Sequence, residues 1–181
     1  MVSVMLRLAL FALLLPAMSA IAQTAGRASE VKIKAAFLYK FGDFVEWPPA
    51  AIERPGGRFT IGVMGADDIA AELERVVADR TIQGRPVSVR RVRHGDALAN
   101  LHLLFVGRSE TLRLAQIMAA ADGQPVLTVT ETENALSSGS MINFVAVDDK
   151  VRFDVALAPA ERSQLKISSR LLAVARKVVT A

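Results

Sequence analysis

Hydrophobic and polar positions follow a helical period over residues 29–47. At 100° per residue one face of this stretch is apolar and the opposite face is polar. The apolar positions are Ile33, Phe37, Leu38, Phe41, Phe44 and Val45. Ser29 can cap the start of such a helix, and Pro48 ends it because the residue before a proline avoids helical geometry. The pattern predicts an amphipathic helix that packs its aromatic face on a core.

Short apolar runs alternate with amphipathic stretches along the rest of the chain. They predict strands at 58–65, 86–92, 101–107 and 125–130, a turn at 81–86, a hairpin of strands at 140–147 and 150–157, and helices at 67–78, 109–121 and 168–179. Strands that alternate with helices favour a parallel sheet, and the hairpin makes the sheet mixed. The predicted fold is α/β: a single three-layer domain whose mixed, mostly parallel sheet of about six strands is flanked by helices.

The first 22 residues have the pattern of a secretory signal peptide. Arg7 supplies a positive charge, a short apolar run follows, and Ala20-Ile21-Ala22 has the small-x-small pattern of a cleavage site. The apolar run is short for a membrane-spanning helix. We expect cleavage after Ala22, a flexible segment over 23–29, and one exported domain over 30–181 that does not span a membrane. An uncleaved anchor is the alternative.

Composition narrows the possible chemistry. The chain has 22 Lys and Arg residues against 18 Asp and Glu, a net charge of +4, which is too small to indicate one class of partner. It contains no cysteine, which excludes thiol catalysis, thiolate ligation of a metal and thiol-based redox control. Composition therefore indicates an exported globular domain and little more.

Two turns between a strand and a helix have glycines that could suit a phosphate site. The stretch GVMGADD lacks the spacing of a dinucleotide fingerprint or a P-loop, and Asp67 and Asp68 would repel an anion there. The second turn, VGRSET, carries Arg108 next to a helix start and is a candidate site for a small anion. A plain capped helix start is the alternative. We therefore expect a Rossmann-like fold without a nucleotide site.

No motif indicates an enzyme, a metal site or a cofactor. His94 and His102 lack the i,i+4 spacing of a zinc helix and are interpreted as surface or strand-edge residues, and there is no GxSxG turn. The basic run RPVSVRRVRH has no interleaved aromatic residues and is interpreted as a charged edge strand, not as a nucleic-acid site.

Two groups of residues are candidates for binding a partner or ligand. Lys166 and Arg170 flank Ser168, which should cap the last helix, so that basic side chains lie beside open backbone N–H groups. Tyr39 and Trp47 leave the apolar face of the first helix, and aromatic side chains are common interface anchors. The alternatives are solvated charges around an ordinary cap, partial burial of Tyr39, and a role for Trp47 in closing the helix end.

Seven stretches, in their order and spacing, resemble the YfiR family of periplasmic regulators. They are KAAFLYKFGDFVEWP (34–48), FTIGVMG (59–65), LHLLFVGRSE (101–110), PVLTVTE (125–131), GSMINFV (139–145), VRFDVALA (151–158) and LKISSRLLAVA (165–175). The resemblance implies a periplasmic α/β domain without catalytic chemistry. It also implies a protein that binds and represses the periplasmic sensor domain of an inner-membrane diguanylate cyclase and so lowers cyclic-di-GMP signalling, with effects on biofilm and motility.

The resemblance implies further partners and leaves some open. An outer-membrane lipoprotein would relieve repression by sequestering the regulator, homodimers are possible, and a sensor kinase could replace the cyclase as partner. The family's disulfide-based redox control is not expected here because the cysteines are missing. A small periplasmic solute-binding protein for an anionic or aromatic ligand is the alternative function, and a hydrolase is a weaker one.

Overall fold

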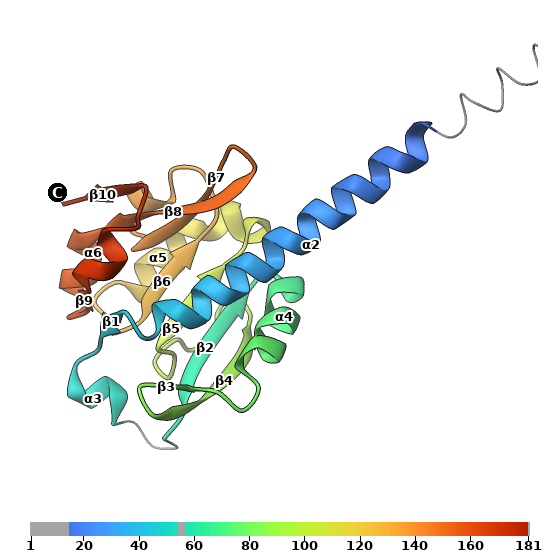
Figure 1. The fold of residues 1–181 in the computed structure, drawn as a ribbon. Helices are drawn as coiled ribbons and strands as arrows, with labels where there is room; N and C mark the ends of the chain where they lie inside the picture. Colours follow the sequence, from blue (N-terminus) through green and yellow to red (C-terminus); the bar gives the residue numbers. More distant parts are fainter. Residues whose placement is uncertain (1–14, 54–56, 181) are drawn as a thin grey trace, which may run out of the picture.

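Helix α2 (Leu15–Phe41) dominates the N-terminal part of the molecule. The computed structural model describes residues 15–53 and 57–180, and residues 1–14 of the predicted signal peptide lie outside them. The C-terminal half of α2 crosses one face of the sheet, while its N-terminal part extends beyond the body of the domain (Figure 1). The helix begins well before Ser29, so residues 23–29, which we expected to be flexible, lie inside it.

The prediction that this helix continues to Trp47 is wrong by more than a turn. After Phe41 the chain turns at Gly42, where a Cβ atom would lie 2.6 Å from Cδ1 of Ile82. The Gln83 side-chain amide donates to the carbonyl oxygens of Gly42 and Val45, at 3.1 and 2.8 Å. Because glycine disfavours helix and these carbonyl groups have tertiary partners, the residues after Phe41 leave the helix.

Eight strands form the main sheet, in the order β10-β8-β7-β6-β5-β2-β4-β3. They are β2 (Phe59–Met64), β3 (Thr81–Ile82), β4 (Arg85–Val92), β5 (Leu103–Val106), β6 (Leu127–Thr130), β7 (Ile142–Val147), β8 (Lys150–Ala156) and β10 (Lys177–Val179). Strands β4, β2, β5, β6 and β7 are parallel to one another, whereas the pairs β3–β4 and β7–β8 are antiparallel. The predicted α/β class with a mostly parallel mixed sheet is confirmed, with eight strands instead of six.

The two additional strands are at the edges of the sheet. Strand β3 and the start of β4 flank a turn at residues 83–84, inside the predicted turn at 81–86, and β10 replaces the end of the predicted helix at 168–179. Only α7 (Ser169–Leu172) of that helix exists. Strand β10 pairs in parallel with β8, and the Arg176 side chain holds Asp154 of β8 with two hydrogen bonds. Backbone pairing with an open sheet edge therefore outweighs the helical spacing of the apolar residues.

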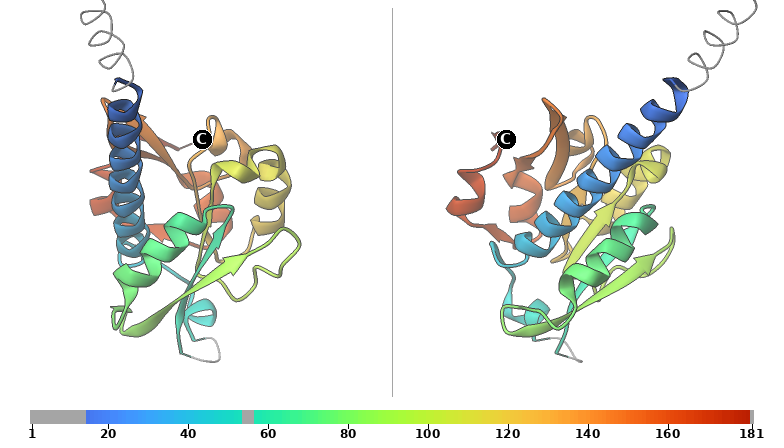
Figure 2. Two further views of the ribbon diagram at one scale, coloured as in Figure 1. Left: turned by 90° about the vertical axis from the view of Figure 1, so that its right-hand side faces the viewer. Right: turned by 45° about the vertical axis from the view of Figure 1, so that its right-hand side comes forward.

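The remaining elements flank the sheet or close its ends. They are a two-stranded sheet of β1 (Val45–Glu46) with β9 (Lys166–Ile167), the helices α3 (Pro49–Ile52), α4 (Asp67–Val77), α5 (Leu114–Ala121) and α6 (Leu157–Arg162), and the 3₁₀ turns η1 (Arg108–Arg113) and η2 (Ala135–Ser138). Helices α2 and α4 lie on one side of the sheet and α5 on the other (Figure 2). The predicted helix at 109–121 is thus divided into η1 and α5.

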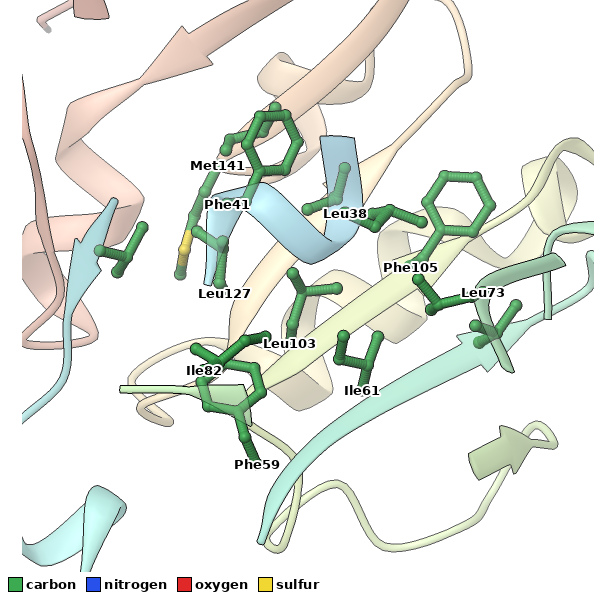
Figure 3. Packing of buried hydrophobic residues seen from close by; sticks show 14 of the residues in the cluster. Leu38, Phe41, Phe59, Ile61, Leu73, Ile82, Leu103, Phe105, Leu127 and Met141 are labelled. Carbon is green, nitrogen blue, oxygen red and sulfur yellow. The ribbon is translucent and has the colours of Figure 1, made fainter. Parts of the chain in front are cut away.

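Two hydrophobic clusters hold these three layers together. The larger one lies between the sheet and α2 with α4, and Figure 3 shows Leu38 and Phe41 of α2 pointing into it. The smaller one lies between the sheet and α5. Phe41 is fully buried, and its ring lies 5.1 to 5.8 Å from those of Phe37, Phe144 and Phe153. Ile33 was expected on this face but is 40% exposed.

Replacing Phe41 by alanine should lower the free energy of unfolding by about 3–5 kcal/mol, because it removes a fully buried ring and leaves a cavity. Urea unfolding monitored by circular dichroism measures the change. Leu112→Ala is the matched control: this side chain is 99% exposed, so the expected change is below about 0.5 kcal/mol. Equal stability of the two variants would contradict the assignment of Phe41 to the core.

Candidate functional site

A small crevice of about 200 Å³ lies at the carboxyl ends of the parallel strands. The turns after β2 and β5, which the sequence offered as separate candidates, meet there: the Gly107 N–H donates to the carbonyl oxygen of Met64 at 2.8 Å. A Cβ atom on Gly107 would lie 2.4 Å from the carbonyl oxygen of Gly65, so only glycine fits this contact. Helix α2 supplies the other side of the crevice with Arg27, Glu30, Val31 and Lys34.

A buried lysine lies at the centre of the crevice. The Lys34 side chain is only 4% exposed, and its ammonium group forms ion pairs with the carboxylates of Glu30 and Glu131. The hydrogen bond from Lys34 holds the pKa of Glu30 below its ordinary value of 4.5. Because Glu131 follows β6 and Lys34 lies on α2, this cluster ties the helix to the end of the sheet.

The anion position predicted at Arg108 is occupied by the chain itself. The backbone N–H of Arg108 donates to Oε1 of Glu131 at 3.2 Å, and its Nε donates to the carbonyl oxygen of the same residue at 3.3 Å. The guanidinium group also lies 3.6 Å from Glu30 Oε1. The turn thus has the expected donors, and an internal carboxylate is bound to them.

The outer end of the crevice is closed by a second, exposed ion pair. Arg27 of α2 donates to Oδ2 of Asp68, in the first turn of α4, at 3.0 Å. Partial burial of Asp68 raises the pKa of its carboxyl, but the hydrogen bonds from Arg27 and from the Ile69 N–H outweigh burial and leave this pKa below its ordinary value. The three cations and three carboxylates of the crevice therefore neutralise one another.

Tyr39 lies at the opposite end of α2 and is partly exposed. Its hydroxyl group donates to the carbonyl oxygen of Thr81 at 3.1 Å. The Arg80 guanidinium carbon and the Lys40 ammonium nitrogen lie 5.4 and 5.9 Å from the centre of its ring. An aromatic ring between two exposed cations is a common composition for a protein interface.

Trp47 is in the core, unlike Tyr39. The side chain is 7% exposed, its ring stands at 89° to that of Phe59, and the indole N–H donates to the carbonyl oxygen of His102 at 3.2 Å. The interpretation of His102 as a surface or strand-edge residue is wrong: it is 2% exposed. Its Nδ1 accepts from the Thr60 N–H, so Nε2 carries the proton and donates to the carbonyl oxygen of Ala51.

The basic group at the end of the chain forms an ordinary cap on a very short helix. Ser168 Oγ accepts from the Leu171 N–H at 3.3 Å, and the exposed Lys166 and Arg170 lie on either side of it. Because β9 pairs with β1, Lys166 lies opposite Glu46, close to the end of α2. The six predicted residues are thus divided among the crevice (Arg108), the core (Trp47) and the surface around the C-terminal end of α2.

Several polar residues of the interior were not singled out from the sequence. Lys34, Asn143 and Asp154 are each less than 10% exposed and stand within amphipathic or alternating stretches, where they look like solvent-facing positions. For Lys34, the sequence offered one signal of burial: the residue stands next to the apolar face of the first helix. Within residues 15–53 and 57–180, no group of three or more His, Asp or Glu side chains is placed to hold a metal ion.

Replacing Lys34 by methionine should lower the free energy of unfolding by about 3 kcal/mol, because it leaves the nearly buried carboxylate of Glu131 without its cation. Urea unfolding at neutral pH gives the value. Arg27→Gln breaks the exposed pair of the same crevice and should cost less than about 1 kcal/mol. If both variants lose the same stability, the buried cluster is not what ties α2 to the sheet.

Acidification should weaken the same contact. The folded-state pKa of Glu30 is lowered, so its contribution is complete above its ordinary value of 4.5 and is lost as the pH falls through the folded value. Urea unfolding from about pH 6 to about pH 3 in the unmodified protein and in Glu30→Gln should show a stability difference that shrinks on acidification. A difference that stays constant with pH would contradict the lowered pKa.

Comparison with known families agrees with the resemblance seen in the sequence. The model of the YfiR/HmsC-like family matches residues 31–176, which include every strand of the main sheet except β10. No curated protein matches the chain significantly. The family is periplasmic, regulatory and non-catalytic, and no helix among the described residues is both long and apolar enough to cross a membrane. The chain belongs to the YfiR/HmsC-like family.

Proposed function

We propose that this protein is a periplasmic repressor of an inner-membrane diguanylate cyclase. It binds the sensor domain of the cyclase and lowers the production of cyclic-di-GMP. The observation that carries the proposal is the family match over residues 31–176, which covers nearly all of the folded body. The predicted signal peptide supports export to the periplasm. Export is required by the proposal because the sensor domain of such a cyclase is reached only from the periplasm.

The surface around the C-terminal end of α2 is the proposed contact with the cyclase. It presents Tyr39 between Arg80 and Lys40, with Lys166 and Arg170 on the neighbouring β9 and α7. Tyr and Arg are the residue types that most often dominate binding energy at interfaces. Trp47 is left out of this surface because its side chain is buried and hydrogen-bonded inside the domain.

Repression in this proposal is a shift of the cyclase between two states. The regulator binds the inactive state of the sensor domain more tightly than the active one, and the ratio of the two affinities sets the limit of repression. An outer-membrane lipoprotein that competes for the regulator would relieve repression by mass action. A sensor kinase in place of the cyclase, and a homodimer as the binding form, are compatible with the same surface.

Replacing Tyr39 by alanine should weaken binding to the cyclase sensor domain at least about tenfold, since it removes the aromatic centre of the proposed contact. Isothermal titration of the purified sensor domain with the regulator measures the loss. Tyr39→Phe keeps the ring and removes only the hydrogen bond to Thr81, so it should bind within about threefold of the unmodified protein.

A control variant changes an exposed residue at the other end of the sheet. Leu112 lies on η1, which follows the carboxyl end of β5, and its replacement by alanine should leave the affinity unchanged. Circular dichroism establishes that each variant is folded. Unchanged binding by a folded Tyr39→Ala protein would remove Tyr39 from the interface.

The repressor function itself is tested in cells. Deletion of the gene should raise cyclic-di-GMP, and a plasmid copy should restore the original level. Affinity purification of the tagged protein should recover an inner-membrane cyclase. An unchanged cyclic-di-GMP level together with no recovered cyclase would disprove the repressor function, whatever the Tyr39 variants do.

A further inference from the structure

A second cleft lies over the end of the sheet formed by β7, β8 and β10, on the face away from α2. It encloses about 710 Å³, within the range of small-molecule sites, and its walls are η2 with the loop before it on one side and α6 on the other. The four elements β7, β8, β10 and α6 are close together in Figure 1. The cleft is separate from the crevice at Arg108 and from the proposed contact surface at Tyr39.

The floor of the cleft is built by the alternation of side chains along the strands. Phe144, Phe153 and Val155 point into the core under α2, so their neighbours in sequence point to the opposite face. The floor residues are Asn143, Val145, Asp154, Ala156, Lys177 and Val179. The strand register aligns three of them in one row, with Asn143 opposite Asp154 and Asp154 opposite Lys177.

This polar row has its acceptors satisfied and some of its donors free. Both carboxylate oxygens of Asp154 accept from Arg176, and Oδ1 of Asn143 accepts from the Thr130 hydroxyl at 2.8 Å. Asn143 is 5% exposed, and its Nδ2 amide group has no hydrogen-bond partner among the described residues. Lys177 follows Asp154 in the row, and its ammonium group forms no ion pair with any described residue.

The Nδ2 group of Asn143 lies in the lining of the cleft, so it can donate to a molecule bound there, and no described group of the protein competes for it. The ammonium group of Lys177, on the other side of Asp154 in the same row, makes a negatively charged acceptor the best match. The lining also contains Arg162 and Arg176, but each is already paired with a carboxylate of the protein, Asp122 and Asp154. Its apolar part is formed by Val145, Ala156 and Pro159, and Glu133 adds an exposed carboxylate. This combination favours one negative charge with an apolar body over a polyanion.

We propose that this cleft is a binding site for a small organic monocarboxylate. The carboxylate group accepts hydrogen bonds from Asn143 Nδ2 and from the Lys177 ammonium group, and the apolar body lies on Val145, Ala156 and Pro159. The Arg176–Asp154 pair holds β10 against β8 and thereby places Lys177 over the cleft. The site does not depend on the repressor function, since it shares no residue with the proposed contact surface.

Titration with benzoate, followed by ¹H–¹⁵N NMR of the purified protein, tests the site. Benzoate should shift the Nδ2 proton signals of Asn143 and the amide signals of β10, while benzyl alcohol, its uncharged analogue, should not. Lys177→Gln should weaken the affinity for benzoate about tenfold, because it removes a charge-assisted hydrogen bond. Lys177 is exposed, so this variant is expected to fold.

The matched control is Lys150→Gln, an exposed lysine on β8 outside the cleft, which should leave the affinity unchanged. Equal binding of benzyl alcohol and benzoate, or equal affinity in Lys177→Gln and the unmodified protein, would overturn the proposal. The proposal would also be overturned if the Asn143 signals shifted with protein concentration and not with benzoate, because a second copy of the chain would then occupy the cleft. The proposal would likewise be overturned if no NMR signal of the cleft shifted at the solubility limit of benzoate.

Discussion

The packing of Phe41 against Phe37, Phe144 and Phe153 determines where every other group on α2 lies. This aromatic cluster fixes the helix on the face of the hairpin β7–β8, with its axis running opposite to the parallel strands. Lys34, two turns earlier, is thereby brought to the carboxyl ends of the strands, and the chain after Phe41 is brought to their amino ends. One apolar contact thus positions a charged cluster and a polar surface at opposite ends of the domain.

The crevice and the cleft differ in how many of their hydrogen-bonding groups have a partner within the protein. In the crevice, cations and carboxylates from α2, α4 and the strand ends are matched, and the backbone donor of Arg108 is bound to Glu131. In the cleft, the acceptors of the polar row are matched while the amide donor of Asn143 is not. A matched cluster contributes to folding and holds elements together. An unmatched donor in a walled cleft is a feature that a ligand can complete.

The sequence predicted those features that depend on local periodicity. It predicted six strands, the α/β class and the apolar face of the first helix, because side-chain alternation and helical spacing are properties of neighbouring residues. The errors occur where tertiary contacts compete with local preference. Residues after Phe41 leave the helix to pair with β9, and residues 177–179 become a strand because the edge of β8 is open to them. Trp47 and His102 are core residues that the sequence could not distinguish from surface ones.

The sequence by itself determined the family, the fold class and the presence of basic and aromatic side chains suited to binding, because each of these rests on residue identity and order. Only the tertiary structure decided which of those side chains remain accessible. Tyr39 stays at the surface and Trp47 does not, and Arg108 is bound by an internal carboxylate. The row of Asn143, Asp154 and Lys177 exists only because β10, which is distant in the chain, pairs with β8 of the hairpin, and no single stretch of sequence contains the backbone pairing that sets this register.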